Sequence, residues 1–348
     1  MLGAAAAALG LVGESENFRL LANVGFWYLM FMAGMEANLR VFLALGRSFL
    51  RRAVIYIALL YLLSTLAVSL SGASGIFIIV LPVMSVGLLG VVIKDFGRAY
   101  EWLNISFLVA TLAEVVSIVL LTIVAAFLSE HSLLDIAKSL AYLVLFLALC
   151  LLAFKALRVV FWHYPNLRLI IMPWHDKDEK DIRFCMGILI LVICAMMLSN
   201  LEIALGAFIA GVFIATFFDH KHDLERKLSG FGFGFLIPIF FIYIGSTFDI
   251  SSLSDSAVLK NAFAIFGAML ALRLLCSLVF LKKFRLKNTL LFALSHSMPL
   301  TLLIATATLL HSAKLIENSL YAAFILTALL EAVVVMSFIK ILMQWKRG

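Results

Sequence analysis

Apolar runs of about 20 residues follow one another along almost the whole chain, separated by short charged or turn-rich breaks. A helix of this length matches the ~30 Å hydrocarbon core of a bilayer. Hydrophobic residues make up 64% of the sequence and charged residues 14%, which excludes an ordinary soluble domain. We therefore predict an all-α membrane protein with about 11 full transmembrane helices plus a partial N-terminal one. The expected spans lie near residues 20–40, 53–71, 75–93, 103–128, 139–162, 183–199, 202–218, 231–248, 258–280, 289–310 and 317–340.

Basic residues indicate the orientation of the chain in the membrane. Of the 27 Lys and Arg residues, 22 fall in or beside alternate loops, beginning with the loop after the first span. The positive-inside rule places these loops and the C-terminus in the cytoplasm, with residue 19 outside. This placement accounts for the net charge of +7, so the lipid bilayer of the cell membrane is expected as a partner and nucleic acid is not. Residues 1–12 are apolar but too short to cross, and we interpret them as the tail of a truncated N-terminal helix.

Two prolines interrupt apolar runs at matching places. Pro82 and Pro299 are each followed 32 residues later by a lone glutamate, Glu114 and Glu331. Proline removes a backbone donor and breaks a helix, which a membrane tolerates only where other groups satisfy the freed carbonyl. Matched interruptions in two halves are typical of the binding sites of secondary transporters. In the predicted topology the two proline helices run in opposite directions, which indicates an inverted repeat with two crossed discontinuous helices.

We expect a single transmembrane domain over residues 1–348. Its half-repeats run roughly over 20–162 and 183–343, joined by a cytoplasmic linker at 163–182 that is rich in His, Pro and charged residues. The sequence shows no paired catalytic carboxylates, no His-rich metal motif and no Ser/His nucleophile pattern. We therefore expect no metal site, no cofactor and no enzymatic activity.

Three stretches resemble motifs of one transporter family. Residues 25–36 read GFWYLMFMAGME, residues 205–211 read LGAFIAG, and residues 231–245 contain PIFF followed by YIG. They resemble helices of the bacterial monovalent cation:proton antiporters, the Kef-type and NapA-type sodium/hydrogen exchangers. The resemblance covers essentially the whole chain. It implies a homodimer that exchanges H⁺ for Na⁺ or K⁺ by alternating access, without a cofactor.

The resemblance also points to charged residues. One family helix carries an aspartate, often preceded by Asp, Asn or Gln, and Glu114 in TLAEVVS resembles this position with Ala113 before it. The family's basic residue in a late helix corresponds to Arg273. We expect Arg273 and Glu331 to form a core charge pair, either structural or involved in ion handling. Because only one proton site is evident, we predict electroneutral exchange of one proton for one cation.

The chemistry of exchange identifies further candidates. A carboxylate inside the membrane loses its hydration, which favours the proton-bound form, and it can give up that proton to a bound cation. Na⁺ and K⁺ bind oxygen, and an interrupted helix offers free carbonyls and helix ends. We therefore predict Thr111, on the Glu114 face, and Ser85, close after Pro82, as ion or proton ligands with Glu114. The secondary candidates are Ser295, His296 and Thr327.

Each polar candidate also has a structural interpretation. Ser and Thr in membrane helices commonly bond to a carbonyl of their own helix, and His296 can be a satisfied interior histidine. Two other functions stay open on the sequence alone. A sodium-coupled organic-anion symporter on a similar scaffold requires a cavity for a large solute. A gated cation channel requires a selectivity filter, and no sequence such as TVGYG occurs.

Overall fold

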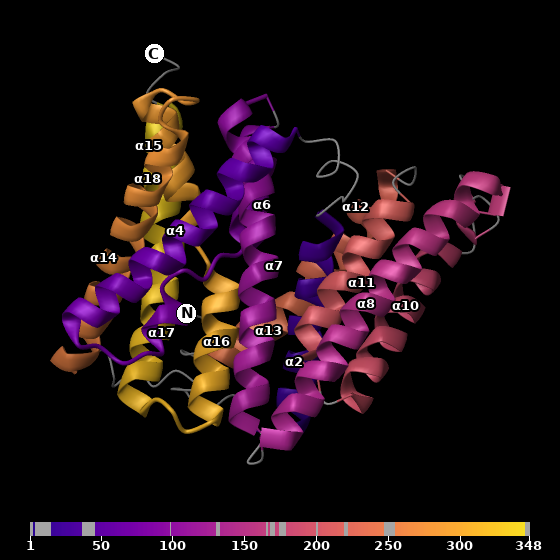
Figure 1. Cartoon of the computed structure of the whole chain (residues 1–348), viewed down its shortest axis with the longest axis horizontal. Helices are drawn as coiled ribbons and strands as arrows, with labels where there is room; N and C mark the ends of the chain where they lie inside the picture. The colour runs from indigo at the N-terminus through magenta and orange to yellow at the C-terminus, as the bar shows by residue number, and fades with distance from the viewer. Residues whose placement is uncertain are drawn as a thin grey trace. The chain divides into compact units, whose positions relative to one another are not determined.

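The structure is a computed structural model that describes residue 3 and residues 15–36, 46–97, 99–129, 133–164, 166–167, 171–173, 179–199, 201–218, 222–246 and 255–344. All regular elements in these ranges are helical (Figure 1). Within them, nine helices are long and apolar enough to cross a membrane. The predicted all-α membrane class is therefore confirmed. The total of about 11 helices and the inverted repeat stay predictions, and the partial N-terminal helix falls almost wholly outside the described residues.

Six of the nine membrane-length helices are continuous, and three are assembled from consecutive segments. The continuous ones are α2 (Glu16–Glu36), α4 (Arg47–Ser71), α7 (Glu101–Ser129), α8 (Leu133–His163), α10 (Lys180–Leu198) and α14 (Ser256–Ser277), the last extended by η3 (Leu278–Phe280). The assembled ones are α12 (His222–Phe231) with η1 (Gly232–Leu236) and α13 (Ile237–Ser246); α15 (Leu286–His296) with α16 (Leu300–Ser312); and α17 (Asn318–Leu330) with η4 (Glu331–Val335) and α18 (Met336–Gln344).

The two other expected spans are shorter in the structure. The run predicted at 75–93 is split into α5 (Phe77–Val80) and α6 (Gly87–Phe96), and the run at 202–218 is α11 (Ile203–Phe217). The chain forms two compact units, which we describe separately. Unit 1 comprises Met1–Leu43 and Thr122–Phe248, and unit 2 comprises Ala44–Leu121 and Asp249–Gly348. Each unit thus draws segments from both predicted half-repeats, and the division into half-repeats stays a prediction.

Unit 1 is built on close contact between glycine-bearing helices. α2 packs against α11 and α13. A Cβ atom on Gly34 of α2 would lie 2.0 Å from the carbonyl oxygen of Phe208, and one on Gly211 of α11 would lie 2.0 Å from that of Phe31. Only glycine permits backbones to approach this closely, as at many helix contacts in membranes. Two of the motif stretches, 25–36 and 205–211, therefore meet in this contact.

Unit 2 contains the interrupted helices. α14 packs against α4, α15 and α17, while α16 contacts α17 and α6 (Figure 1). The first interruption spans residues 81–86, between α5 and α6, and includes Pro82. The second spans residues 297–299, between α15 and α16, and ends at Pro299.

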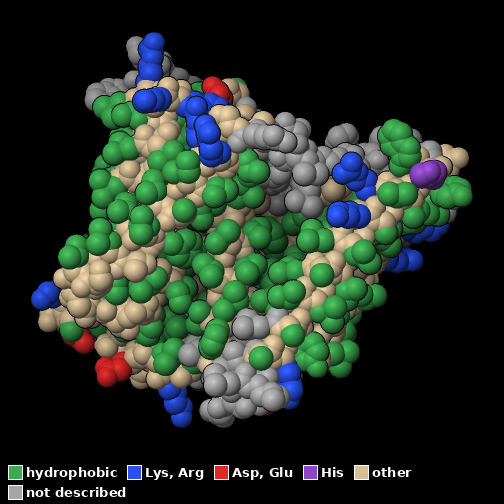
Figure 2. Space-filling view, in the orientation of Figure 1, with side chains coloured by type: hydrophobic (Ala, Val, Ile, Leu, Met, Phe, Trp, Pro, Cys, Tyr) green, Lys and Arg blue, Asp and Glu red, His purple; other side chains and the backbone are tan. Residues whose placement is uncertain are grey.

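The outer surfaces of the helices are largely apolar. On the face seen in Figure 2, charged side chains gather mostly near the helix ends, and hydrophobic side chains occupy much of the area between them. α8 exposes large apolar side chains such as Val144, Leu151 and Leu152 along its length. Such a surface is stable against lipid chains and unfavourable in water.

Candidate functional site

The backbone at the first interruption is satisfied by a neighbouring helix. Because Pro82 has no N–H group, the carbonyl of Ile78 loses the donor that a continuous helix would supply four residues later. The Ser64 hydroxyl of α4 donates to the Ile78 carbonyl oxygen at 3.3 Å and to that of Phe77 at 3.1 Å. The interruption therefore has its own polar support inside unit 2.

Glu114 lies at this interruption. Its side chain is on α7 and has no exposed surface. The Ser85 hydroxyl donates to Oε1 at 2.8 Å, and the Val86 N–H donates to Oε2 at 3.3 Å. Val86 immediately precedes α6, so the carboxylate occupies the N-terminal end of that helix, where the dipole favours negative charge. The structure thus brings together Glu114, Ser85 and Pro82, three of the residues singled out in the sequence.

Thr301 is a site residue that the sequence reasoning missed. Its Oγ1 lies 2.8 Å from the Ser85 Oγ, and it belongs to the first turn of α16, after the second interruption. Since the Ser85 proton is used toward Glu114, the Thr301 hydroxyl donates to Ser85. Two consecutive hydrogen bonds, from Thr301 to Ser85 and from Ser85 to Glu114, therefore link the start of α16 to the buried carboxylate. A sequence signal was available, because Thr301 follows Pro299 by two residues much as Ser85 follows Pro82 by three.

Thr111 does not reach the carboxylate in this conformation. Its hydroxyl donates to the Phe107 carbonyl at 2.8 Å, one turn earlier in α7. This is the local bond that membrane Thr residues commonly make. In this structure Thr111 therefore stabilises its own helix, and its role as an ion ligand stays a prediction.

Arg273 of α14 connects both interruptions. Its Nη1 donates to the Leu81 carbonyl at 3.2 Å and its Nη2 donates to the Val83 carbonyl at 2.5 Å, one on each side of Pro82. Its Nε donates at 2.8 Å to the carbonyl of His296, the last residue of α15. A planar guanidinium with five fixed donors can satisfy several acceptors at once. One buried side chain therefore ties together the backbones of two broken helices.

Glu331 is buried without a hydrogen bond. It has no exposed surface, and neither carboxylate oxygen has a hydrogen-bond partner among the described residues. The hydrogen bonds of Arg273 go instead to backbone carbonyls, including that of Met269 in its own helix at 2.9 Å. The described contacts thus contain no hydrogen-bonded pair of Arg273 with Glu331. An electrostatic pairing of the two stays a prediction.

His296 is fully hydrogen-bonded in the interior of unit 2. Its Nε2 lies 3.0 Å from the carbonyl oxygen of Ser106, which can only accept, so Nε2 carries the proton. Its Nδ1 then accepts from the Tyr56 hydroxyl at 2.9 Å. The Ser295 Oγ lies 2.5 Å from the Ser106 Oγ. These contacts connect α15 to α4 and α7. In this structure His296 therefore acts as a satisfied interior histidine.

Thr327 likewise connects two helices. Its hydroxyl contacts the Ala262 carbonyl of α14 at 3.1 Å and the Ala323 carbonyl of its own helix at 2.8 Å. It lies one helical turn before Glu331. In this conformation it supports packing rather than the carboxylate.

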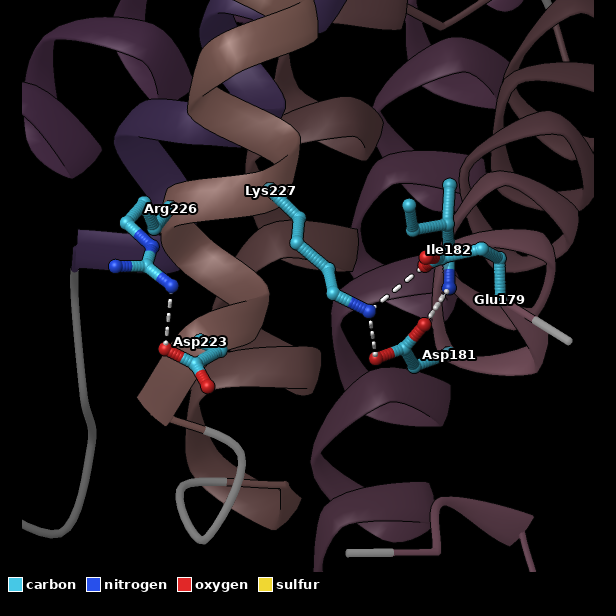
Figure 3. A network of polar contacts seen from close by, with 6 residues as sticks. All are labelled: Glu179, Asp181, Ile182, Asp223, Arg226 and Lys227. Carbon is cyan, nitrogen blue, oxygen red and sulfur yellow. Dashed lines mark hydrogen bonds and ion pairs between the residues drawn. The ribbon is translucent and has the colours of Figure 1, made fainter. Parts of the chain in front are cut away.

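A charged cluster in unit 1 lies outside this site (Figure 3). Lys227 of α12 contacts Glu179 at 2.7 Å and the buried Asp181 at 3.4 Å, and the Asp181 carboxylate also accepts from the Ile182 N–H at 2.8 Å. Arg226 pairs with Asp223 at 3.1 Å on the exposed side of α12. The ion pairs of Lys227 connect the N-terminal end of α10 to α12. Within the described ranges, no group of three or more His, Cys, Asp or Glu side chains could hold a metal ion.

Apolar helices, interrupted in two places around a buried carboxylate, define the scaffold of a secondary membrane transporter. The chain belongs to the transmembrane sodium/hydrogen exchanger family, whose family model matches residues 1–345. The predicted family is therefore confirmed.

Individual relatives agree with this family. The putative Na⁺/H⁺ antiporter YjbQ of Bacillus subtilis (strain 168) is 28% identical over 351 residues, which cover 93% of this chain and 55% of that protein. The Na⁺/H⁺-K⁺ antiporter GerN of Bacillus cereus is 28% identical over 255 residues, covering 70% of this chain and 62% of GerN. The chain thus spans less than two thirds of the length of either relative.

A solved structure has the same fold. The sodium proton antiporter MjNhaP1 from Methanocaldococcus jannaschii superposes with a TM-score of 0.67, covering 97% of this chain and 91% of that one. At 14% sequence identity, this likeness establishes the architecture alone.

Proposed function

We propose that this protein exchanges protons for a monovalent cation, Na⁺ or K⁺, across the cell membrane by alternating access. Glu114 binds the proton and the cation in turn. The family supports this function, as do the names of YjbQ, a putative Na⁺/H⁺ antiporter, and GerN, a Na⁺/H⁺-K⁺ antiporter. The single observation that carries the assignment to Glu114 is its complete burial at an interrupted helix, beside two hydroxyl groups.

The proposal follows from the cost of a buried charge. An ionised carboxylate without a counter-charge is unfavourable in the membrane, so Glu114 is stable when it holds either a proton or a cation. The oxygens of Glu114, Ser85 and Thr301 are hard ligands of the kind that alkali cations bind, and the two hydroxyls can rotate to present lone pairs. Because the same oxygens serve both occupants, binding of one excludes the other.

The interruptions provide the means of movement in this proposal. Arg273 holds both of them through backbone carbonyls, so a change in its contacts alters both broken helices together. A homodimer with its Lys- and Arg-rich loops and its C-terminus in the cytoplasm completes the proposal.

The test is an exchange assay on the full chain in lipid vesicles that contain a pH-sensitive dye. Adding Na⁺, K⁺ or Li⁺ outside should raise the internal pH as protons leave. Glu114→Gln should reduce this response to background while the protein stays folded, because the amide can neither release a proton nor neutralise a cation. Thr111→Val is a matched control on the same helix and should retain exchange.

Unchanged exchange in Glu114→Gln, with a normal pH profile, would rule out Glu114 as the carrier. The same vesicles separate the alternative functions. Cation currents without proton counterflow would indicate a channel. A response only in the presence of an organic anion would indicate a symporter.

A further inference from the structure

The two buried glutamates of unit 2 occupy opposite environments. Glu114 accepts two hydrogen bonds and lies at a helix N-terminus, so its ionised form has support. Glu331 accepts none from the described residues and has no exposed surface. It also begins the π-helical turn η4, a feature often found at functional sites. Carboxylates whose environments differ in this way commonly hold their protons under different conditions.

Among the described contacts, Arg273 donates to backbone carbonyls and not to Glu331. Four of its N–H donations are accounted for, to the carbonyls of Leu81, Met269, Val83 and His296. Leu81 and Val83 lie in the first interruption and His296 immediately precedes the second, and both interruptions must shift if the protein alternates between two access states. A shift of the first interruption withdraws Leu81 and Val83 from the guanidinium. The freed N–H groups can then turn to Glu331, a buried carboxylate without a described hydrogen bond, on the π-helical turn that continues α17, the helix packed against α14.

We propose that Glu331 is a second proton-binding site, coupled to the helix interruptions through Arg273. Glu331 carries a proton while Arg273 donates to the interruptions. It releases that proton to water when Arg273 exchanges a carbonyl of the first interruption for the Glu331 carboxylate. The O–H bond of the carboxylic acid breaks, the proton passes to water, and the new carboxylate is neutralised by the guanidinium. This inference rests on the proposed antiport and changes its stoichiometry, because a cycle then moves two protons for each cation.

The helices next to Glu331 carry few other titratable groups, and on α17 itself the group is Tyr321. The other titratable side chains on helices that contact α17 or α18 are Lys260 and Cys276 on α14, Lys287 and His296 on α15, and His311 on α16. On α18 itself, Lys340 pairs with Asp95 of α6 at 2.9 Å.

Infrared spectroscopy of the full chain in lipid bilayers tests the proton directly. A protonated carboxyl gives a C=O stretch that a carboxylate lacks and that shifts in D₂O. At neutral pH and saturating Na⁺ or K⁺, which displaces the proton from Glu114, the wild type should show such a band, Glu331→Gln should lose it, and Glu114→Gln should keep it. A wild-type band that is unchanged by Glu331→Gln would overturn the proposal. If Glu331→Gln fails to fold, Glu331→Asp should shift the frequency of the band, and an unshifted band would overturn the proposal equally.

A transport measurement tests the coupling. In vesicles clamped at zero and then at about −100 mV, the equilibrium pH gradient driven by the cation should shift with voltage for the wild type and not for Glu331→Gln. A wild type insensitive to voltage would contradict a second transported proton. The two measurements also separate the two proposals. An infrared band assigned to Glu331 without any cation-driven proton movement would leave the proton site standing and refute the antiport.

Discussion

The two units of the protein bury different kinds of side chain. Of the 19 buried polar or charged side chains among the described residues, 16 lie in unit 2 and three lie in unit 1. Unit 1 instead joins α2 to α11 through glycines so close to the facing backbone that no Cβ fits. Buried polar groups are unfavourable in a membrane unless they are satisfied or functional, whereas close glycine packing stabilises helix pairs. The comparison assigns the chemistry to unit 2 and a packing role to the contact of α2 with α11.

The largest expected effect comes from Arg273→Ala in unit 2. It leaves the carbonyls of Leu81, Val83 and His296 without their donor, so we expect a loss of about 3–5 kcal/mol in unfolding free energy. Thermal unfolding in detergent measures this loss. Arg273→Lys keeps the charge but not the planar guanidinium, so its unfolding free energy should lie between those of the wild type and Arg273→Ala.

The double variant with Glu331→Gln sharpens this result. If Glu331 is protonated and unpaired, the two losses should add to within about 0.5 kcal/mol. A clear recovery of stability in the double variant would instead show that the two residues form an ion pair in the resting protein.

A smaller effect is expected from Gly34→Ala in unit 1. The new methyl group would lie 2.0 Å from the Phe208 carbonyl oxygen, so α2 and α11 must separate, at a cost of about 1–3 kcal/mol. The apparent cation affinity of the folded fraction should stay unchanged. Gly187→Ala on α10 is the matched control, because its Cβ would meet no atom within 4 Å. A change in cation affinity in Gly34→Ala would break the proposed division between packing and chemistry.

The smallest effect is expected from Thr301→Val. The substitution keeps the volume but removes the hydroxyl that donates to Ser85, so the KM for the cation should rise about tenfold, equivalent to ~1.4 kcal/mol. Thr306→Val is the control on the same helix, because its hydroxyl bonds to the Leu302 carbonyl one turn earlier. Equal KM values for both variants would remove Thr301 from the site.

The helix interruptions and the buried carboxylate could be predicted from the sequence, whereas the contacts between distant residues could not. Pro82 and Pro299 are recognisable because proline lacks a donor, and Glu114 stands out because a carboxylate is rare in an apolar run. Thr301 was missed because its contact with Ser85 joins residues 216 positions apart.

Contacts with backbone atoms are even harder to predict from a sequence. The partners of Arg273 are carbonyl oxygens, which every residue carries, so a charged residue such as Glu331 was the only partner that the sequence could suggest. The glycine motifs could be recognised by resemblance, but their contact between α2 and α11 depends on the three-dimensional approach of the two helices.

The most direct test of the central claim is the release of protons when a cation binds. Na⁺ or K⁺ is added to the purified full chain in weakly buffered solution, and the protons released are counted against the cations bound. We predict proton release by the wild type and by Glu114→Asp, and neither proton release nor cation binding by Glu114→Gln. Cation binding by Glu114→Gln with undiminished proton release would contradict competition at Glu114.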